Sequence, residues 1–179
     1  MPLSTIDNTG LSQSQILSAI NMPTGSVVQV VNNTIQTSGN VTSTTSNSLV
    51  ATSTTLTITP QFSTSKILLL ANATGWSNAG STTSYSQAIY TIYNGSTNLA
   101  GTNASPSGLA MAMFYPGSGG TQYNGTGISM TYLDSPATTS PVTYTVYLCA
   151  GYSGCTAYWG ATPGAFGYSK AIFTAMEIR

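Results

Sequence analysis

Very few side chains in this sequence suit acid–base, nucleophilic or metal chemistry. The 179 residues include no histidine. The formally charged side chains are Asp7, Lys66, Asp134, Lys170, Glu177 and Arg179. Catalysis near neutral pH uses histidine or paired carboxylates, and a nucleophilic serine needs a neighbouring base. Asp134 precedes Ser135 and Pro136, the setting of a turn-forming aspartate. We therefore expect a protein that is not an enzyme and holds no cofactor.

Two cysteines, Cys149 and Cys155, flank the residues AGYSG at the end of an apolar strand pattern. This spacing suits a disulfide across a short hairpin loop. The alternative is a pair of small buried thiols in a protein made in a reducing cytosol. We expect no metal site, because there are no histidines and two cysteines without other soft ligands fall short of the four that a structural zinc requires.

Several aromatic side chains lie in or near the expected loops. Aromatic rings stack on sugars and give large contact areas at low entropic cost, so these residues are candidate contacts to a host receptor or another surface. The alternative is that these side chains are exposed incidentally and bind nothing. The residues are Tyr115, Tyr123, Tyr152, Tyr158, Trp159 and Tyr168.

The sequence is almost free of charge. Charged residues make up 3% of the chain and sum to zero, against about 25% in average proteins. Three scattered cations cannot line a nucleic-acid groove or hold an anionic membrane surface, and no apolar run has transmembrane length. We expect no nucleic-acid partner, no membrane insertion and a surface that favours association with proteins.

The clearest local signal is a strand, a turn and a second strand between Thr55 and Trp76. Leu56 and Ile58 alternate with threonines, the pattern of a strand with one buried face. Pro60 ends that strand. The run from Ile67 to Ala71 is apolar at every position, which predicts a strand covered on both faces.

Further short strands with Ser, Thr, Gly and Asn turns predict an all-β fold, an antiparallel, jelly-roll-like β-sandwich over residues 25–179. A long polar connection is expected over residues 32–46 and a glycine-rich loop over residues 116–127. Asn94-Gly95 predicts a type I′ hairpin turn, with Leu99 beginning the return strand. Strands are expected at residues 27–31, 54–59, 66–73, 85–93, 109–115, 128–133, 142–149, 156–159 and 171–178.

Residues 1–24 differ from the rest and form an N-terminal arm. Ser12 and Gln15 fit a capping box, which predicts one short helix over about Ser12–Ile20. A helix of that length is marginal alone in water, so its apolar side needs a surface. That surface belongs either to its own domain or to a neighbour, through virion anchoring or subunit exchange. The apolar side consists of Leu11, Ile16, Leu17 and Ile20.

Five segments occur in the same order as in a known β-domain. They are GSVVQVVNNT, TITPQFSTSKILLLANATG, IYNGSTNLAG, YLDSPATTSPVTYTVYL and IFTAMEIR. Together they resemble a β-domain of virion proteins of tailed bacteriophages, often described as tail fibre or structural proteins. The resemblance covers about Met22 to Arg179. It implies a homotrimer in a virion that is assembled in the host cytoplasm.

The resemblance leaves the place in the virion open. We expect a non-enzymatic capsid decoration, cement or head-fibre protein that binds the major capsid protein or other virion proteins. The alternative is the receptor-binding domain of a tail fibre or spike, which touches a host glycan or protein. A fibre normally needs an attachment domain and a shaft, and neither is expected in this sequence, which favours the capsid. A third interpretation, a free-standing adhesion or lectin module outside any virion, is supported only by the composition.

Overall fold

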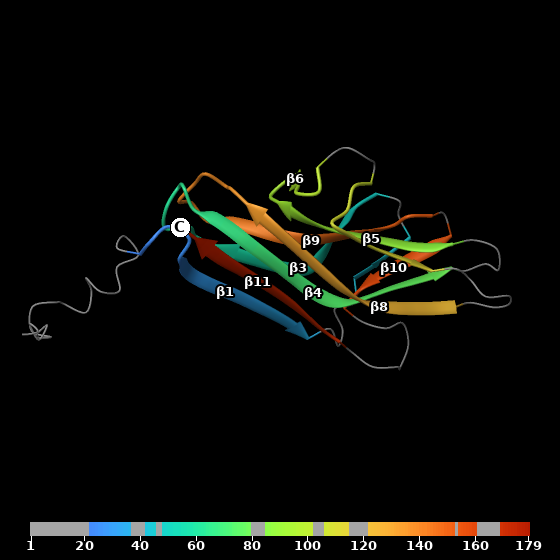
Figure 1. Ribbon diagram of the computed structural model, residues 1–179. Helices are drawn as coiled ribbons and strands as arrows, with labels where there is room; N and C mark the ends of the chain where they lie inside the picture. The colour runs from blue at the N-terminus through green and yellow to red at the C-terminus, as the bar shows by residue number, and fades with distance from the viewer. Residues whose placement is uncertain are drawn as a thin grey trace, which may run out of the picture.

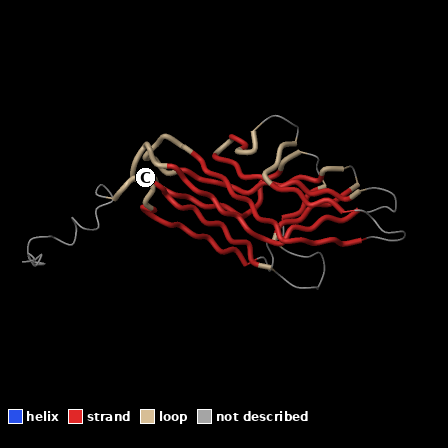
Figure 2. The backbone as a smooth tube through the Cα atoms, viewed as in Figure 1, coloured by secondary structure: helices blue, strands red, loops and turns tan. Residues whose placement is uncertain are grey.

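The computed structural model describes residues 22–36, 42–45, 48–79, 85–101, 106–114, 122–152, 154–160 and 169–179, and these ranges contain strands and no helix (Figure 2). The helix expected over Ser12–Ile20 lies outside them. The strands are β1 (Val27–Gln36), β2 (Thr42–Thr44), β3 (Val50–Ile58), β4 (Lys66–Ala79), β5 (Ser86–Asn94), β6 (Thr97–Asn98), β7 (Ala110–Phe114), β8 (Gln122–Asp134), β9 (Val142–Ala150), β10 (Cys155–Trp159) and β11 (Lys170–Ile178).

The strands form two antiparallel sheets (Figure 1), which confirms the predicted all-β, antiparallel class. The six-stranded sheet has the order β1-β11-β4-β10-β2, with β8 also paired to β4. The five-stranded sheet has the order β3-β9-β5-β6, with β7 also paired to β5. Strand β4 is the centre of the larger sheet, because β8 pairs with its full length while β11 and β10 share its other edge.

The core lies between the sheets and follows the alternation of each strand. Leu56 and Ile58 are buried, as their period-two pattern predicts. In β4, Ile67 is buried, whereas Leu68 and Leu70 are only half-buried. The prediction that this run is covered on both faces is wrong, because the smaller sheet packs against one face only. The outer face of β4 carries leucines without a covering layer among the described residues.

Trp159 is a core residue, which corrects its prediction as a loop aromatic. Its indole Nε1 donates to Oγ1 of Thr54 at 2.9 Å and so joins the two sheets. Its ring centroid lies 5.5 Å from that of Tyr90, whose hydroxyl donates to the Tyr158 carbonyl at 2.9 Å. Gly75 makes room for this phenol, since a Cβ there would come within 2.6 Å of the hydroxyl oxygen. Burial raises the pKa of Tyr90.

Where it is described, the polar connection predicted over residues 32–46 is mostly strand. Residues 32–36 continue β1 in register with β11, and residues 42–44 pair with β10. Two asparagines suit this edge because their amides find partners: Asn33 Nδ2 donates to the Thr55 carbonyl at 2.7 Å. Asn32 Nδ2 donates to Oγ1 of Thr174 at 2.8 Å. Asparagine is typical of loops, which is why a loop was predicted here. In the structure, however, the two asparagine side chains stabilise an edge strand.

The hairpin after β5 is present, but its turn differs from the prediction. Asn94 pairs with Thr97, so Gly95 and Ser96 are the central residues. Only Gly95 has a positive φ, of 56°, whereas a type I′ turn needs positive φ at both central positions. The return strand ends at Asn98, before the predicted start at Leu99. The predicted loop over residues 116–127 likewise gives way to strand from residue 122.

The two ends of the described chain meet at one end of the sandwich, which we call the terminal pole (Figure 1). Gly25 N donates to the Arg179 carbonyl at 2.6 Å, and Arg179 N donates to the Ser26 carbonyl at 3.0 Å. The Arg179 guanidinium donates to the Met22 carbonyl at 2.6 Å and lies 5.0 Å from the Phe62 ring centroid. The C-terminal residue therefore fixes the point at which the arm joins the domain.

Candidate functional site: an aliphatic face on the larger sheet

An apolar row crosses the outer face of the six-stranded sheet near the terminal pole. Val30 of β1 lies opposite Met176 of β11, Met176 lies opposite Leu68 of β4, and Leu68 lies opposite Leu133 of β8. Adjacent strands are about 4.8 Å apart, so the row is about 14 Å long. Cross-strand register thus brings together side chains that are far apart in the sequence.

The row is exposed at both ends. Val30 is 56% exposed and Leu133 is 46% exposed, because they lie on the two outer strands. Leu68 and Met176 between them are half-buried. Further apolar residues flank the row on the same face. We call the whole set the aliphatic face, and it consists of Val30, Leu68, Leu70, Leu133, Ile172, Met176 and Ile178.

The charged residues near the aliphatic face lie at its margins. On the described outer surface of this sheet, the charged residues are Lys66, opposite Ile178, and Lys170, opposite Gln36. A contiguous exposed apolar patch is typical of an interaction surface. A partner placed on this face has few charges to desolvate, so burial of apolar area provides the favourable free energy.

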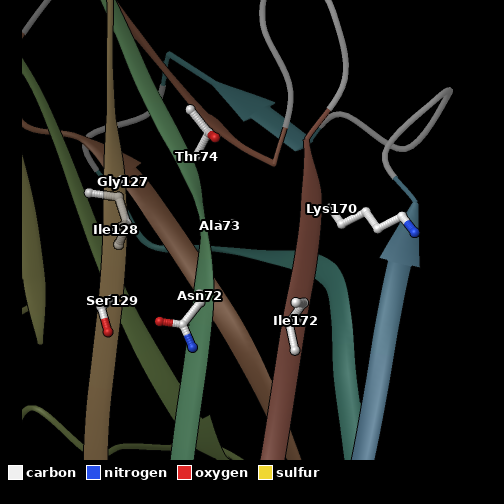
Figure 3. A pocket seen from close by; sticks show the side chains of 8 residues that line it. All are labelled: Asn72, Ala73, Thr74, Gly127, Ile128, Ser129, Lys170 and Ile172. Atoms are coloured by element: carbon white, nitrogen blue, oxygen red, sulfur yellow. The ribbon is translucent and has the colours of Figure 1, made fainter.

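A shallow depression of about 430 Å³ adjoins the aliphatic face where β8, β4 and β11 run side by side (Figure 3). It shares Ile172 with the face, and Asn72, Thr74 and Ser129 supply its polar groups. The Lys170 side chain points toward β1, away from Asn72 and Ser129 (Figure 3). These groups do not converge on one point, and the depression continues the outer surface of the sheet beyond the aliphatic face.

The two carboxylates of the described chain lie on either side of β4. Asp134 and Glu177 both pair with Ile67, on β8 and β11 respectively. Asp134 Oδ2 accepts hydrogen bonds from Asn94 Nδ2 at 2.9 Å and from the Tyr144 hydroxyl at 2.8 Å. Burial and the Asp134 carboxylate raise the pKa of Tyr144. Ile67 is fully buried and lies between the two carboxylates. Each carboxylate accepts hydrogen bonds from its own set of neighbours.

Glu177 is a fully buried carboxylate with its own set of donors. Its Oε2 accepts from Gln29 Nε2 at 2.6 Å, and its Oε1 accepts from the backbone N of Gln61 at 2.8 Å and of Phe62 at 3.2 Å. Burial pushes the pKa of Glu177 upward, but these hydrogen bonds outweigh it and hold the pKa below its ordinary value. Glu177 therefore anchors the turn after β3 to the terminal pole.

The predicted disulfide is not formed, because both cysteines are buried free thiols. Cys155 points into the core between the sheets, and its Sγ donates to the Tyr85 carbonyl at 3.1 Å. Cys149 alternates with the core residues Leu148 and Ala150 and so faces the other side of the smaller sheet. A disulfide would have to pass through that sheet. The alternative prediction, two buried thiols, matches the structure.

Both thiols are expected to react slowly with a maleimide in the folded protein and rapidly after denaturation. Each is buried and so shielded from the reagent, and burial raises the pKa of Cys149 to about 11, so little Cys149 thiolate is present at pH 8. Counting labelled cysteines by mass spectrometry, with and without guanidinium, tests this. Two modified thiols within seconds in native buffer would contradict it.

The remaining predicted aromatic contacts divide between surface and undescribed positions. Tyr152 is 42% exposed and stacks on Tyr85, which is 39% exposed, with ring centroids 5.9 Å apart. This pair lies at the distal pole, opposite the chain ends. Tyr158 is half-buried on the outer face, opposite Trp76. The side chain of Tyr123 and all of Tyr115 and Tyr168 lie outside the described residues, as do the arm residues Leu11, Ile16, Leu17 and Ile20.

No known protein-family model matches this chain, and no curated protein matches it either. Among the described residues, no helix is long and apolar enough to cross a membrane. The same residues contain no cluster of three potential metal ligands.

The aliphatic face is the feature that the sequence interpretation missed. Its signal was present, since Met176 and Ile178 alternate with buried positions of β11, as Leu68 and Leu70 do in β4. Such alternation shows that two apolar faces exist, but it does not show which one a second sheet covers.

Proposed function

We propose that this protein is a non-enzymatic structural protein of a tailed-phage virion, placed on the capsid surface as a decoration, cement or head-fibre protein. The observation that carries the proposal is the exposed, charge-free aliphatic face on a two-sheet domain. Contiguous apolar area of this kind favours stable contact with another protein. The proposed partners are the major capsid protein or other virion proteins, with no nucleic acid and no membrane insertion.

We propose a jelly-roll-like arrangement for the sandwich. Without the short strands β2, β6 and β10, the larger sheet has the order β1-β11-β4-β8 and the smaller sheet β3-β9-β5-β7. Eight strands in two four-stranded sheets, with long connections between the sheets, are typical of jelly rolls, which are common in viral capsid proteins. This strand order supports both the fold assignment and the place in a virion.

We propose that the arm anchors the domain through Leu11, Ile16, Leu17 and Ile20. The arm joins at the terminal pole, where Arg179 holds Met22. An attachment there leaves the distal pole directed away from the particle, so the domain can decorate a surface without covering it.

The number of copies per purified particle tests the placement. Quantitative mass spectrometry, scaled to the major capsid protein and to a tail protein, should find hundreds of copies of a capsid decoration protein. A dozen or two copies would place the protein on the tail. Absence from purified particles would refute the virion proposal altogether.

The second candidate function is receptor binding by a tail fibre or spike, and the stacked Tyr85–Tyr152 pair favours it. Two exposed rings at the distal pole form a platform on which a sugar ring can stack. Replacing both tyrosines by alanine should then reduce adsorption of phage to host cells while leaving the particle composition unchanged. Unchanged adsorption would remove this candidate.

We propose that the protein is a homotrimer. A surface with so few charges offers little electrostatic repulsion to self-association. Light scattering at micromolar concentration should give about three times the chain mass of 18.4 kDa. A single species of the chain mass would contradict this prediction.

Binding to the particle is expected to be nearly independent of salt. With six formal charges in the chain, burial of apolar surface and hydrogen bonds must provide the affinity, and neither is screened by ions. Washing particles with increasing NaCl, followed by quantification of the retained protein, measures this. Release by moderate salt alone would show that ion pairs hold the protein.

A further inference from the structure

The aliphatic face begins beside the point at which the arm joins the domain. Val27 lies opposite Ile178, a member of the face. Met22, five residues before Val27, is held by the Arg179 guanidinium at 2.6 Å. Ile20 is two residues from Met22, a span of at most about 7 Å. The apolar residues of the arm are thus tethered close to an apolar surface of the same chain.

The two surfaces match in chemistry. Leu11, Ile16, Leu17 and Ile20 are aliphatic, and residues 11–20 contain no charged side chain. The aliphatic face is likewise free of charge except for the lysines at its margins. Contact between them buries apolar area on both sides without removing a charge from water.

The two surfaces also match in size. A helix of nine residues, as the sequence predicts for Ser12–Ile20, is about 13 to 14 Å long. The row from Val30 to Leu133 crosses four strands and is about 14 Å long. One such segment is therefore long enough to cover the row from one outer strand to the other.

We propose that in the free protein residues 11–20 dock on the aliphatic face of their own chain. A short tether gives an effective concentration in the millimolar range, so the arm outcompetes a second copy present at micromolar concentration. The docked arm shields the face before assembly. Binding of the arm to a particle then releases the face, so anchoring and docking become linked steps. The inference concerns the free protein and goes beyond the proposed function.

Binding of the dye ANS, which fluoresces on exposed apolar surface, tests the shielding. A chain that starts at Met22 should show several-fold higher fluorescence than the full-length protein. Leu68→Thr with Leu133→Thr in the short chain should return the signal to the full-length level. Ile16→Ser with Leu17→Ser should behave as the truncation does, with Asn8→Ser as the matched control. Equal fluorescence of the long and short chains would overturn the proposal.

Disulfide trapping tests where the arm lies, and it does not depend on the folding of the truncated chain. Leu11 lies nine residues before Ile20, about 13 to 14 Å along a helix, so Leu11→Cys combined with Leu133→Cys should form a disulfide within one chain on mild oxidation. The control pairs Leu11→Cys with Thr57→Cys, an exposed position on the smaller sheet, and should remain reduced. Disulfides that form only between chains, or equally in both pairs, would show that the arm does not occupy its own aliphatic face.

Discussion

A chain that starts at Met22 is expected to fold as the full-length protein does but to be absent from virus particles. The first strand begins at Val27, and the bond from Arg179 to the Met22 carbonyl is retained. The four aliphatic residues of the arm, each contributing about 1.5 to 3 kcal/mol if fully buried, are lost. Complementing a phage that lacks the gene with the short chain, then measuring the protein in purified particles, tests this.

The comparison of thermal melting with particle binding gives the control. The short chain should lose only what the docked arm contributes and should still unfold in one cooperative transition, because the core strands begin at Val27. Ile16→Ser with Leu17→Ser should reduce incorporation in milder form. If the melting midpoint of the short chain falls as severely as its binding to particles, the arm is part of the fold and the anchoring proposal is wrong.

Replacing Glu177 by alanine is expected to destabilise the domain by about 2 to 4 kcal/mol, because part-buried donors left without an acceptor each cost roughly 1 to 3 kcal/mol. The backbone N of Gln61 and of Phe62 would lose their acceptor, whereas Gln29 Nε2 would keep its bond to the Thr59 carbonyl at 2.7 Å. The melting midpoint should fall by about 5 to 15 °C. Thr131→Ala, on the exposed face of β8, is the control and should change it little.

The contribution of Glu177 should depend on pH with a defined sign. The pKa of Glu177 is lower in the folded protein than the ordinary 4.5. The unfolded chain therefore binds more protons at acid pH, and stability falls as the pH drops from about 4.5 through the folded pKa. Urea unfolding between pH 7 and pH 3 should show this fall, and Glu177→Gln should reduce it. Equal stability of the unsubstituted protein at pH 7 and at pH 3 would contradict the prediction.

The sequence predicted the fold class well because alternation is a local property. Leu56 and Ile58 face the core for the reason that their pattern indicated, and the alanines and methionines of β7 alternate between buried and exposed positions. The predictions failed where tertiary partners decide the outcome. Asn33 lies in a strand because its amide reaches a carbonyl of β3, and no property of the nearby sequence encodes that partner.

The candidate site was predicted less well, because it depends on register. Val30 and Leu133 are more than a hundred positions apart, and only the pairing of four strands places them in one row.

The disulfide prediction for the two cysteines failed for a related reason. Their spacing fits a hairpin, but the strands that carry them belong to different sheets. Trp159 ends the strand predicted at residues 156–159, but its burial depends on the opposite sheet, where Thr54 accepts its indole hydrogen bond.

The meeting of the two ends of the described chain at the terminal pole determines how the domain responds to mechanical force. Strands β1 and β11 are antiparallel neighbours whose outer ends lie side by side, from Val27 opposite Ile178 onward. Tension between the two termini would peel this pair apart one hydrogen bond at a time, which requires little force. Tension between the arm and the distal pole instead runs along the strands and loads many ladder bonds at once. A domain tethered by its arm and pulled at its far end therefore carries load in its stronger direction.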